Sequence, residues 1–74
     1  MTPEQFYELD EMEQAETVWE GKHIGHTEDE EHNIVLYKID NLFIEAYYHR
    51  ESNFLRKFRA YEEHELLDIY LLRN

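Results

Sequence analysis

The sequence predicts an α+β fold in which a four-stranded antiparallel β-meander is flanked by an N-terminal and a C-terminal helix, in the order α-β-β-β-β-α. Three observations predict it. The chain has 74 residues, which allows a single domain spanning residues 1–74. Apolar residues recur at three- and four-residue steps near the N-terminus. Runs rich in β-branched and aromatic residues, separated by turn residues, follow in the middle of the chain.

The N-terminal segment is typical of one amphipathic helix. Thr2 can cap it, Pro3 suits the first helical position, and Gln5 completes a capping box. Gly21 is suited to end the helix in a left-handed conformation. We therefore predict a helix over residues 3–20. Its apolar stripe on an otherwise acidic surface is Phe6, Leu9, Met12 (or Glu13), Ala15 and Val18 or Trp19.

Four strands are predicted after this helix, with neighbours in sequence pairing in order because the connections are short. Gly25 permits a bulge in the first strand, and the acidic run 28–32 forms a hairpin loop. Asp40-Asn41 is a two-residue hairpin turn, since both residue types tolerate positive φ. A further turn covers residues 51–53. The predicted strands are residues 22–27, 33–39, 42–49 and 54–61.

The C-terminal segment, residues 62–72, is apolar nearly all round and is predicted to form the closing helix. Both helices must bury apolar surface on the sheet. The sequence leaves open whether they share one face of it.

The hairpin 33–50 has two partly apolar faces, whereas an antiparallel sheet with one face in water normally alternates cleanly. Three explanations are open: helices cover both faces, the tyrosines are half-exposed, or the second face meets another copy or another protein. A domain this small has a marginal core, which favours association. The predicted interaction surface is Val35, Tyr37, Ile39, Phe43 and Tyr47.

The net charge of −11 is concentrated at the N-terminal end, where residues 1–31 hold eleven acidic side chains and one base, Lys22. Such a field repels nucleic acid and anionic membranes, and it suits a basic partner protein. Arg56, Lys57 and Arg59 lie among aromatic residues, a pattern that can hold single-stranded nucleic acid. The overall charge opposes that function, so we expect neither a nucleic-acid nor a membrane partner.

Three histidines and the acidic run beside them are the group of side chains with metal-ligand chemistry. His23 and His26 would point to opposite faces of a regular strand, although a bulge at Gly25 could bring them together, and His32 follows the loop. Their spacing matches no zinc pattern, and the run 28–31 lacks the glycine of a calcium loop. We expect no metal and no cofactor, while metal binding by these histidines stays open.

Catalytic patterns are missing from the sequence, so we expect no enzyme. The single serine, Ser52, lies in a predicted turn, and two glycines are too few for a phosphate-binding loop. No carboxylate lies in a predicted pocket that would shift its pKa. There is no cysteine, which excludes disulfides and thiolate metal sites.

The N-terminus lacks the basic and apolar regions of a signal peptide, and no apolar run approaches the ~20 residues that span a bilayer. We therefore expect a cytoplasmic protein. Several segments, among them Trp19-Glu20-Gly21, Glu30-Glu31-His32, Leu36 to Asp40 and Glu45 to Tyr48, resemble short bacterial proteins of unknown function and similar length. This resemblance covers most of the chain and implies no activity or site.

The function that these observations predict is a small, acidic, non-enzymatic protein–protein interaction module. We expect it to self-associate as a homodimer through the second sheet face or an edge strand, or to bind a partner protein. Two alternatives are an acidic nucleic-acid mimic that inhibits a DNA-binding protein and a metal-responsive sensor that uses the histidine loop.

Overall fold

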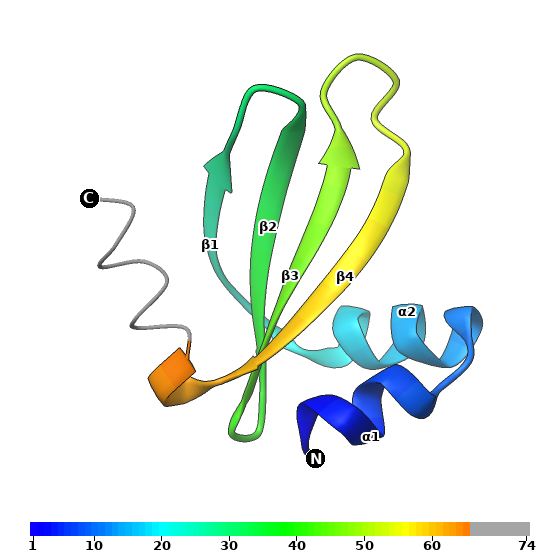
Figure 1. The fold of residues 1–74 in the computed structure, drawn as a ribbon, viewed down its shortest axis with the longest axis vertical. Helices are drawn as coiled ribbons and strands as arrows, with labels where there is room; N and C mark the ends of the chain where they lie inside the picture. Colours follow the sequence, from blue (N-terminus) through cyan, green and yellow to red (C-terminus); the bar gives the residue numbers. More distant parts are fainter. Residues whose placement is uncertain (66–74) are drawn as a thin grey trace.

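A computed structural model describes residues 1–65 as an α+β fold with one four-stranded antiparallel sheet, in the order β1-β2-β3-β4 (Figure 1). The elements are α1 (Pro3–Glu8), α2 (Glu11–Glu20), β1 (Lys22–Glu28), β2 (His32–Ile39), β3 (Leu42–His49) and β4 (Leu55–Glu62). Residues 63–65 are helical. The predicted meander is confirmed, and the rest of the predicted closing helix lies outside the described residues.

The prediction of one helix over residues 3–20 is wrong, because the helical conformation is interrupted at Leu9 and Asp10. Leu9 has an extended conformation, with ψ of 150°. Asp10 then caps a second helix: its Oδ1 accepts the Glu13 backbone N–H at 2.8 Å, and Glu13 Oε1 accepts the Asp10 N–H at 3.4 Å. This second capping box ends α1 and starts α2. The predicted box of Thr2 and Gln5 is present as well.

Both helices pack on the same face of the sheet, at the end that holds the β2–β3 turn (Figure 1). Phe6 of α1 and Val18 of α2 are fully buried there. In the predicted stripe, Met12 and Trp19 are instead 72% and 64% exposed. We call this face the helix-covered face; its core residues on the strands are Tyr37, Ile39, Leu42, Ile44, Phe58 and Ala60. The opposite side is called the second face.

Gly21 ends α2, but the left-handed conformation predicted for it is wrong, since its φ is −73°. A glycine is required at this position because there is no room for a side chain. A Cβ atom at this position would lie 2.6 Å from Ile39 Cγ1 and 3.1 Å from the Lys38 carbonyl oxygen. The absence of a side chain therefore lets the end of α2 approach β2 closely.

At the other end of the sheet, hydrogen bonds hold the β1–β2 loop and the β3–β4 loop together. In the β1–β2 loop, Asp29 Oδ1 accepts the backbone N–H groups of Glu31 at 2.8 Å and His32 at 2.7 Å. Arg50 follows β3, and its backbone N–H donates to the Glu31 carbonyl at 2.9 Å. Its guanidinium donates to the Asp29 carbonyl at 3.3 Å. The β2–β3 turn has Asp40 at φ 54°, as its sequence predicts.

Candidate functional site

The five residues of the predicted interaction surface do not share one face. Directly opposite residues of an antiparallel pair lie on the same face. The register places Val35, Tyr37 and Ile39 opposite Ala46, Ile44 and Leu42, on the helix-covered face. Phe43 and Tyr47 lie on the second face and are only 9% and 4% exposed. The prediction of a single exposed surface is therefore corrected, and neither group offers a large free apolar area.

The three predicted histidines are likewise divided between the faces. A bulge near Gly25 brings His23 and His26 to one face, where they pair with Tyr37 and Val35. His32 lies on the second face, with its ring centroid 5.4 Å from that of Tyr47. The bulge therefore occurs as the sequence allowed, but the three imidazoles do not converge on one site.

A different group of possible metal ligands lies where β4 ends, in Glu62, His64 and Glu65. One ligand atom from each lies within 4.8 Å of the others. His64 Nδ1 is 3.6 Å from Glu62 Oε2, and these side chains are 73% and 47% exposed. The sequence analysis missed this group, whose signal is the run Glu62-Glu63-His64-Glu65. All three residues are exposed, so this group offers ligand atoms at the surface rather than an enclosed metal site.

The free edge of β4 is the feature that the sequence analysis did not locate. β4 is the last strand in the sheet, so it has a strand partner on one side among residues 1–65. The Tyr7 hydroxyl accepts the Ala60 backbone N–H at 2.9 Å on the other side. N–H groups of alternate residues in a strand point the same way, so that of Phe58 also points out of this edge. Within the described part of the chain, Tyr7 thus closes one end of the edge and leaves the preceding residues of β4 open.

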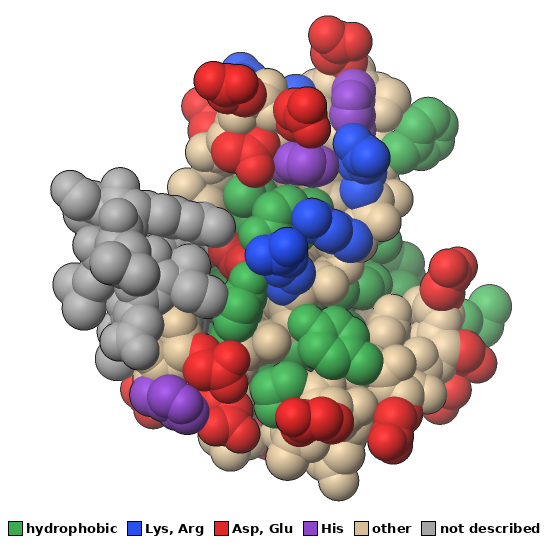
Figure 2. Space-filling view, in the orientation of Figure 1, with side chains coloured by type: hydrophobic (Ala, Val, Ile, Leu, Met, Phe, Trp, Pro, Cys, Tyr) green, Lys and Arg blue, Asp and Glu red, His purple; other side chains and the backbone are tan. Residues whose placement is uncertain are grey.

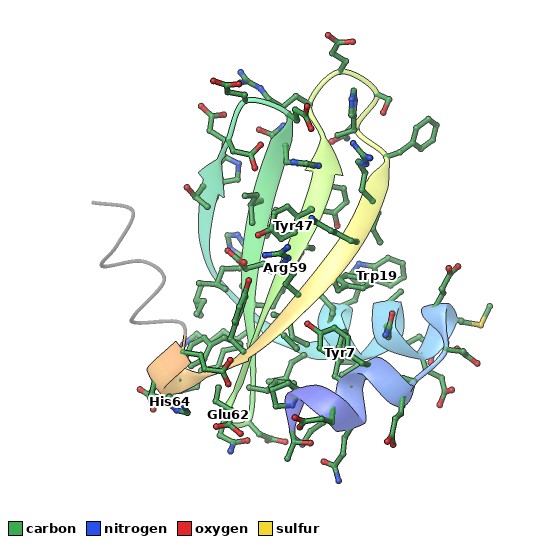
Figure 3. The ribbon with its side chains drawn as sticks, viewed as in Figure 1. Tyr7, Trp19, Tyr47, Arg59, Glu62 and His64 are labelled. Atoms are coloured by element: carbon green, nitrogen blue, oxygen red, sulfur yellow. The ribbon has the colours of Figure 1, made fainter. Side chains whose placement is uncertain are left out.

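A cavity of about 330 Å³ lies beside that open stretch, between the helices and β4. We call it the edge groove; it is lined by Tyr7, Glu11, Gln14, Leu55, Arg56, Lys57 and Phe58. Gln14 holds the two helices together by donating to the Phe6 carbonyl at 3.2 Å. Figure 3 shows Tyr7 reaching from α1 toward β4. The helix break at Leu9 and Asp10 therefore helps to shape the groove, because α1 and α2 each supply part of its wall.

Positive charge gathers along β4, in the three side chains Arg56, Lys57 and Arg59, which we call the basic edge. Figure 2 shows Lys and Arg side chains, drawn in blue, near the centre of the molecule, with acidic side chains above and below them. Among residues 1–65, no carboxylate forms a salt bridge with any of the three. The basic edge thus contrasts in sign with the acidic side chains of the loops and the helices.

Tyr47 supports two of these cations. Lys57 Nζ lies 4.8 Å from the centroid of its ring, and the Arg59 guanidinium carbon lies 5.9 Å from it (Figure 3). Such contacts hold a cation over the electron-rich face of the ring. The Tyr47 hydroxyl donates to Glu45 Oε1 at 2.9 Å, and the Glu45 side chain is fully buried. The buried Glu45 carboxylate therefore helps to hold the Tyr47 ring in position against the two cations.

Arg59 also takes part in this buried network through Tyr61. Burial raises the pKa of the Tyr61 phenol, and the hydrogen bond with Arg59 opposes that rise. The same hydrogen bond is the main reason that the pKa of the Arg59 guanidinium is raised. Arg59 is therefore held by Tyr61 as well as by Tyr47, while both Arg59 and Lys57 are exposed to solvent.

A bulge limits the length of the open edge. Lys57 pairs with Tyr47 and Leu55 with Tyr48, so Arg56 is the extra residue in β4. Bulges and lysine or arginine side chains are devices that protect an edge from pairing with similar strands. The regular part of the edge is accordingly short, from Lys57 to Arg59, and unfavourable for another basic strand.

Comparisons of the chain with protein-family models, curated proteins and solved structures found no match. The resemblance to short bacterial proteins therefore stays a prediction. No helix within residues 1–65 is long and apolar enough to cross a membrane.

Proposed function

We propose that this protein is a non-enzymatic module that binds an extended segment of a partner protein by adding it as a strand to β4. In this mode, main-chain hydrogen bonds give affinity, and pockets beside the edge select side chains. The observation that supports it most is the outward-facing backbone of Phe58 next to the edge groove. Tyr7 marks where the added strand would have to end.

A different protein suits this edge better than a second copy of the chain. If β4 paired antiparallel with its own counterpart about Lys57, the two Lys57 side chains would lie opposite each other. If the pairing centred on Phe58, Lys57 would lie opposite Arg59. Like charges placed directly opposite are destabilising. Self-association through the second face would bury little apolar surface, because Phe43 and Tyr47 are already buried, with exposed fractions of only 9% and 4%.

The two alternative functions have weaker support. An acidic mimic of nucleic acid needs carboxylates along one continuous ridge, and the break at Leu9 and Asp10 divides the acidic segment into two short helices. A sensor built on the histidine loop needs the imidazoles together, and His32 lies on the face opposite to His23 and His26.

Selection of random peptides on the immobilised protein, followed by mapping on its amide NMR spectrum, tests the proposal. We expect the enriched peptides to shift the amide signals of residues 57–59 and of Tyr7. Peptides that shift only the signals of β1, at the other edge of the sheet, would overturn the assignment of the site. Failure to enrich any peptide would overturn the proposed function.

A further inference from the structure

We infer that the segment recognised at the β4 edge is an acidic amphipathic strand, with carboxylates at alternate positions and apolar side chains between them. The inference rests on the proposed function and specifies the partner for that same edge. Side chains of an added strand alternate between the two faces of the sheet. The two faces of the β4 edge differ in chemistry, so each selects its own half of the added side chains.

The second face selects negative charge. Lys57 and Arg59 both lie on this face, opposite Tyr47 and Glu45 of β3. Tyr47 holds both cations in place by the ring contacts at 4.8 and 5.9 Å. An added strand would place alternate side chains next to them, where pairs of opposite charge are stabilising and pairs of like charge are not. Carboxylates on this side therefore suit the edge.

The helix-covered side selects apolar side chains. Phe58 forms the floor here, and its ring packs edge-on against Phe6 at a centroid distance of 5.8 Å. Tyr7 and Leu55 add further apolar surface that is 52% and 39% exposed. Glu11 lies on the far wall of the groove. A carboxylate entering beside α2 would meet that acid, whereas an apolar side chain would contact Tyr7, Leu55 and Phe58; Arg56, which also lines the groove, belongs to the β4 bulge.

The net charge of −11 does not remove this preference. Its excess lies in residues 1–31, and charges separated by more than ~8 Å are largely screened at physiological salt. Lys57 and Arg59 are the charged residues of β4 on the second face, so they lie next to an added strand. Added salt is accordingly expected to weaken binding of the acidic segment.

Fluorescence anisotropy with three labelled peptides of about seven residues, within the usual range of strand lengths, tests the inference. The first peptide alternates valine and glutamate, the second valine and lysine, and the third valine and serine. Two favourable cross-strand charge pairs at ~0.5 kcal/mol each predict ~5-fold tighter binding of the glutamate peptide than of the serine peptide. The lysine peptide should bind more weakly than both.

A matched pair of charge reversals locates the effect. Lys57→Glu changes the basic edge, whereas Lys22→Glu makes the same change in net charge on β1, at the opposite edge. We expect Lys57→Glu to weaken binding of the glutamate peptide ~5-fold and to strengthen binding of the lysine peptide. Lys22→Glu should change the binding of neither peptide. Circular dichroism melting of both variants checks that they are folded.

The outcomes separate the inference from the proposed function. Equal binding of the three peptides would overturn the charge preference and leave strand addition supported. Preference for the glutamate peptide that survives Lys57→Glu would also overturn the inference, because the selecting charge would lie elsewhere. If none of the three peptides binds, both the inference and the proposed function fail.

Discussion

The Tyr7 hydroxyl accepts the backbone N–H of Ala60 at 2.9 Å, so a side chain of the first helix closes one end of an otherwise open sheet edge. The two residues are 53 positions apart in the sequence. Their contact fixes α1 beside β4 and so creates the wall of the edge groove. This one hydrogen bond gives the sheet edge a defined end.

Removing that hydroxyl is expected to loosen the closed end. Tyr7→Phe keeps the ring and removes the acceptor, so the free energy of unfolding should fall by about 1 kcal/mol. Urea denaturation measures this change. Hydrogen exchange should also become faster at the Ala60 amide, and an unchanged exchange rate there would mean that Tyr7 does not protect the edge.

The second capping box predicts a loss of stability when Asp10 is replaced. Asp10→Ala removes the acceptor of the Glu13 N–H, and loss of an N-cap costs about 1 kcal/mol. Glu16→Ala removes an equal charge from the exposed middle of α2 and should change stability by less than ~0.5 kcal/mol. Equal unfolding midpoints for the two variants would contradict a separate start for α2.

The two glycines of the chain form a second matched pair. Gly21→Ala places a Cβ atom 2.6 Å from Ile39 Cγ1, and such overpacking should cost ~1–3 kcal/mol. In Gly25→Ala the added Cβ atom has no neighbour within 4 Å, so the free energy of unfolding should stay within ~0.5 kcal/mol of that of the parent protein. Denaturation of both variants tests the close approach of α2 to β2, which would be refuted if Gly21→Ala were as stable as Gly25→Ala.

The β1–β2 loop predicts a pH-dependent contribution from Asp29. Hydrogen bonds, chiefly from the Glu31 backbone N–H, hold the pKa of this carboxyl below its ordinary value of 3.8. A carboxyl whose pKa is lowered by folding stabilises the protein above the unfolded-state pKa. That contribution is lost as the pH falls through the folded-state pKa.

Comparison with Asp29→Ala isolates this contribution. The parent protein should be more stable than the variant at neutral pH, and the difference should shrink only as the pH falls below 3.8. Urea denaturation at several pH values measures the difference. A difference that stays constant down to the most acidic pH would show that ionised Asp29 does not hold the loop.

Much of the fold could be predicted from the sequence because its strands carry strong local signals. Asp40-Asn41 marks a two-residue turn, and the alternating runs on both sides of it fix the hairpin. The same turn contains the information that the face assignment missed. A two-residue loop places Ile39 opposite Leu42, so Val35 must share a face with Ala46 rather than with Phe43.

The helix break and the binding edge were harder to predict for different reasons. Asp10 and Glu13 are a local capping signal, but the apolar stripe from Phe6 to Val18 runs through the break and suggests one helix. The edge groove has no local signal, because Tyr7 and Phe58 meet only when α1 packs on β4. Long-range packing therefore decided the part of the structure that the proposed function uses.

Amide hydrogen exchange at Phe58, in the protein alone and with the peptide that alternates valine and glutamate, tests the central claim most directly. The account predicts faster exchange at Phe58 than at Ala60 in the free protein, because Tyr7 protects only the latter. The bound peptide should slow exchange at Phe58 and leave Ala60 unchanged. Exchange at Phe58 that stays the same with bound peptide would contradict strand addition at β4.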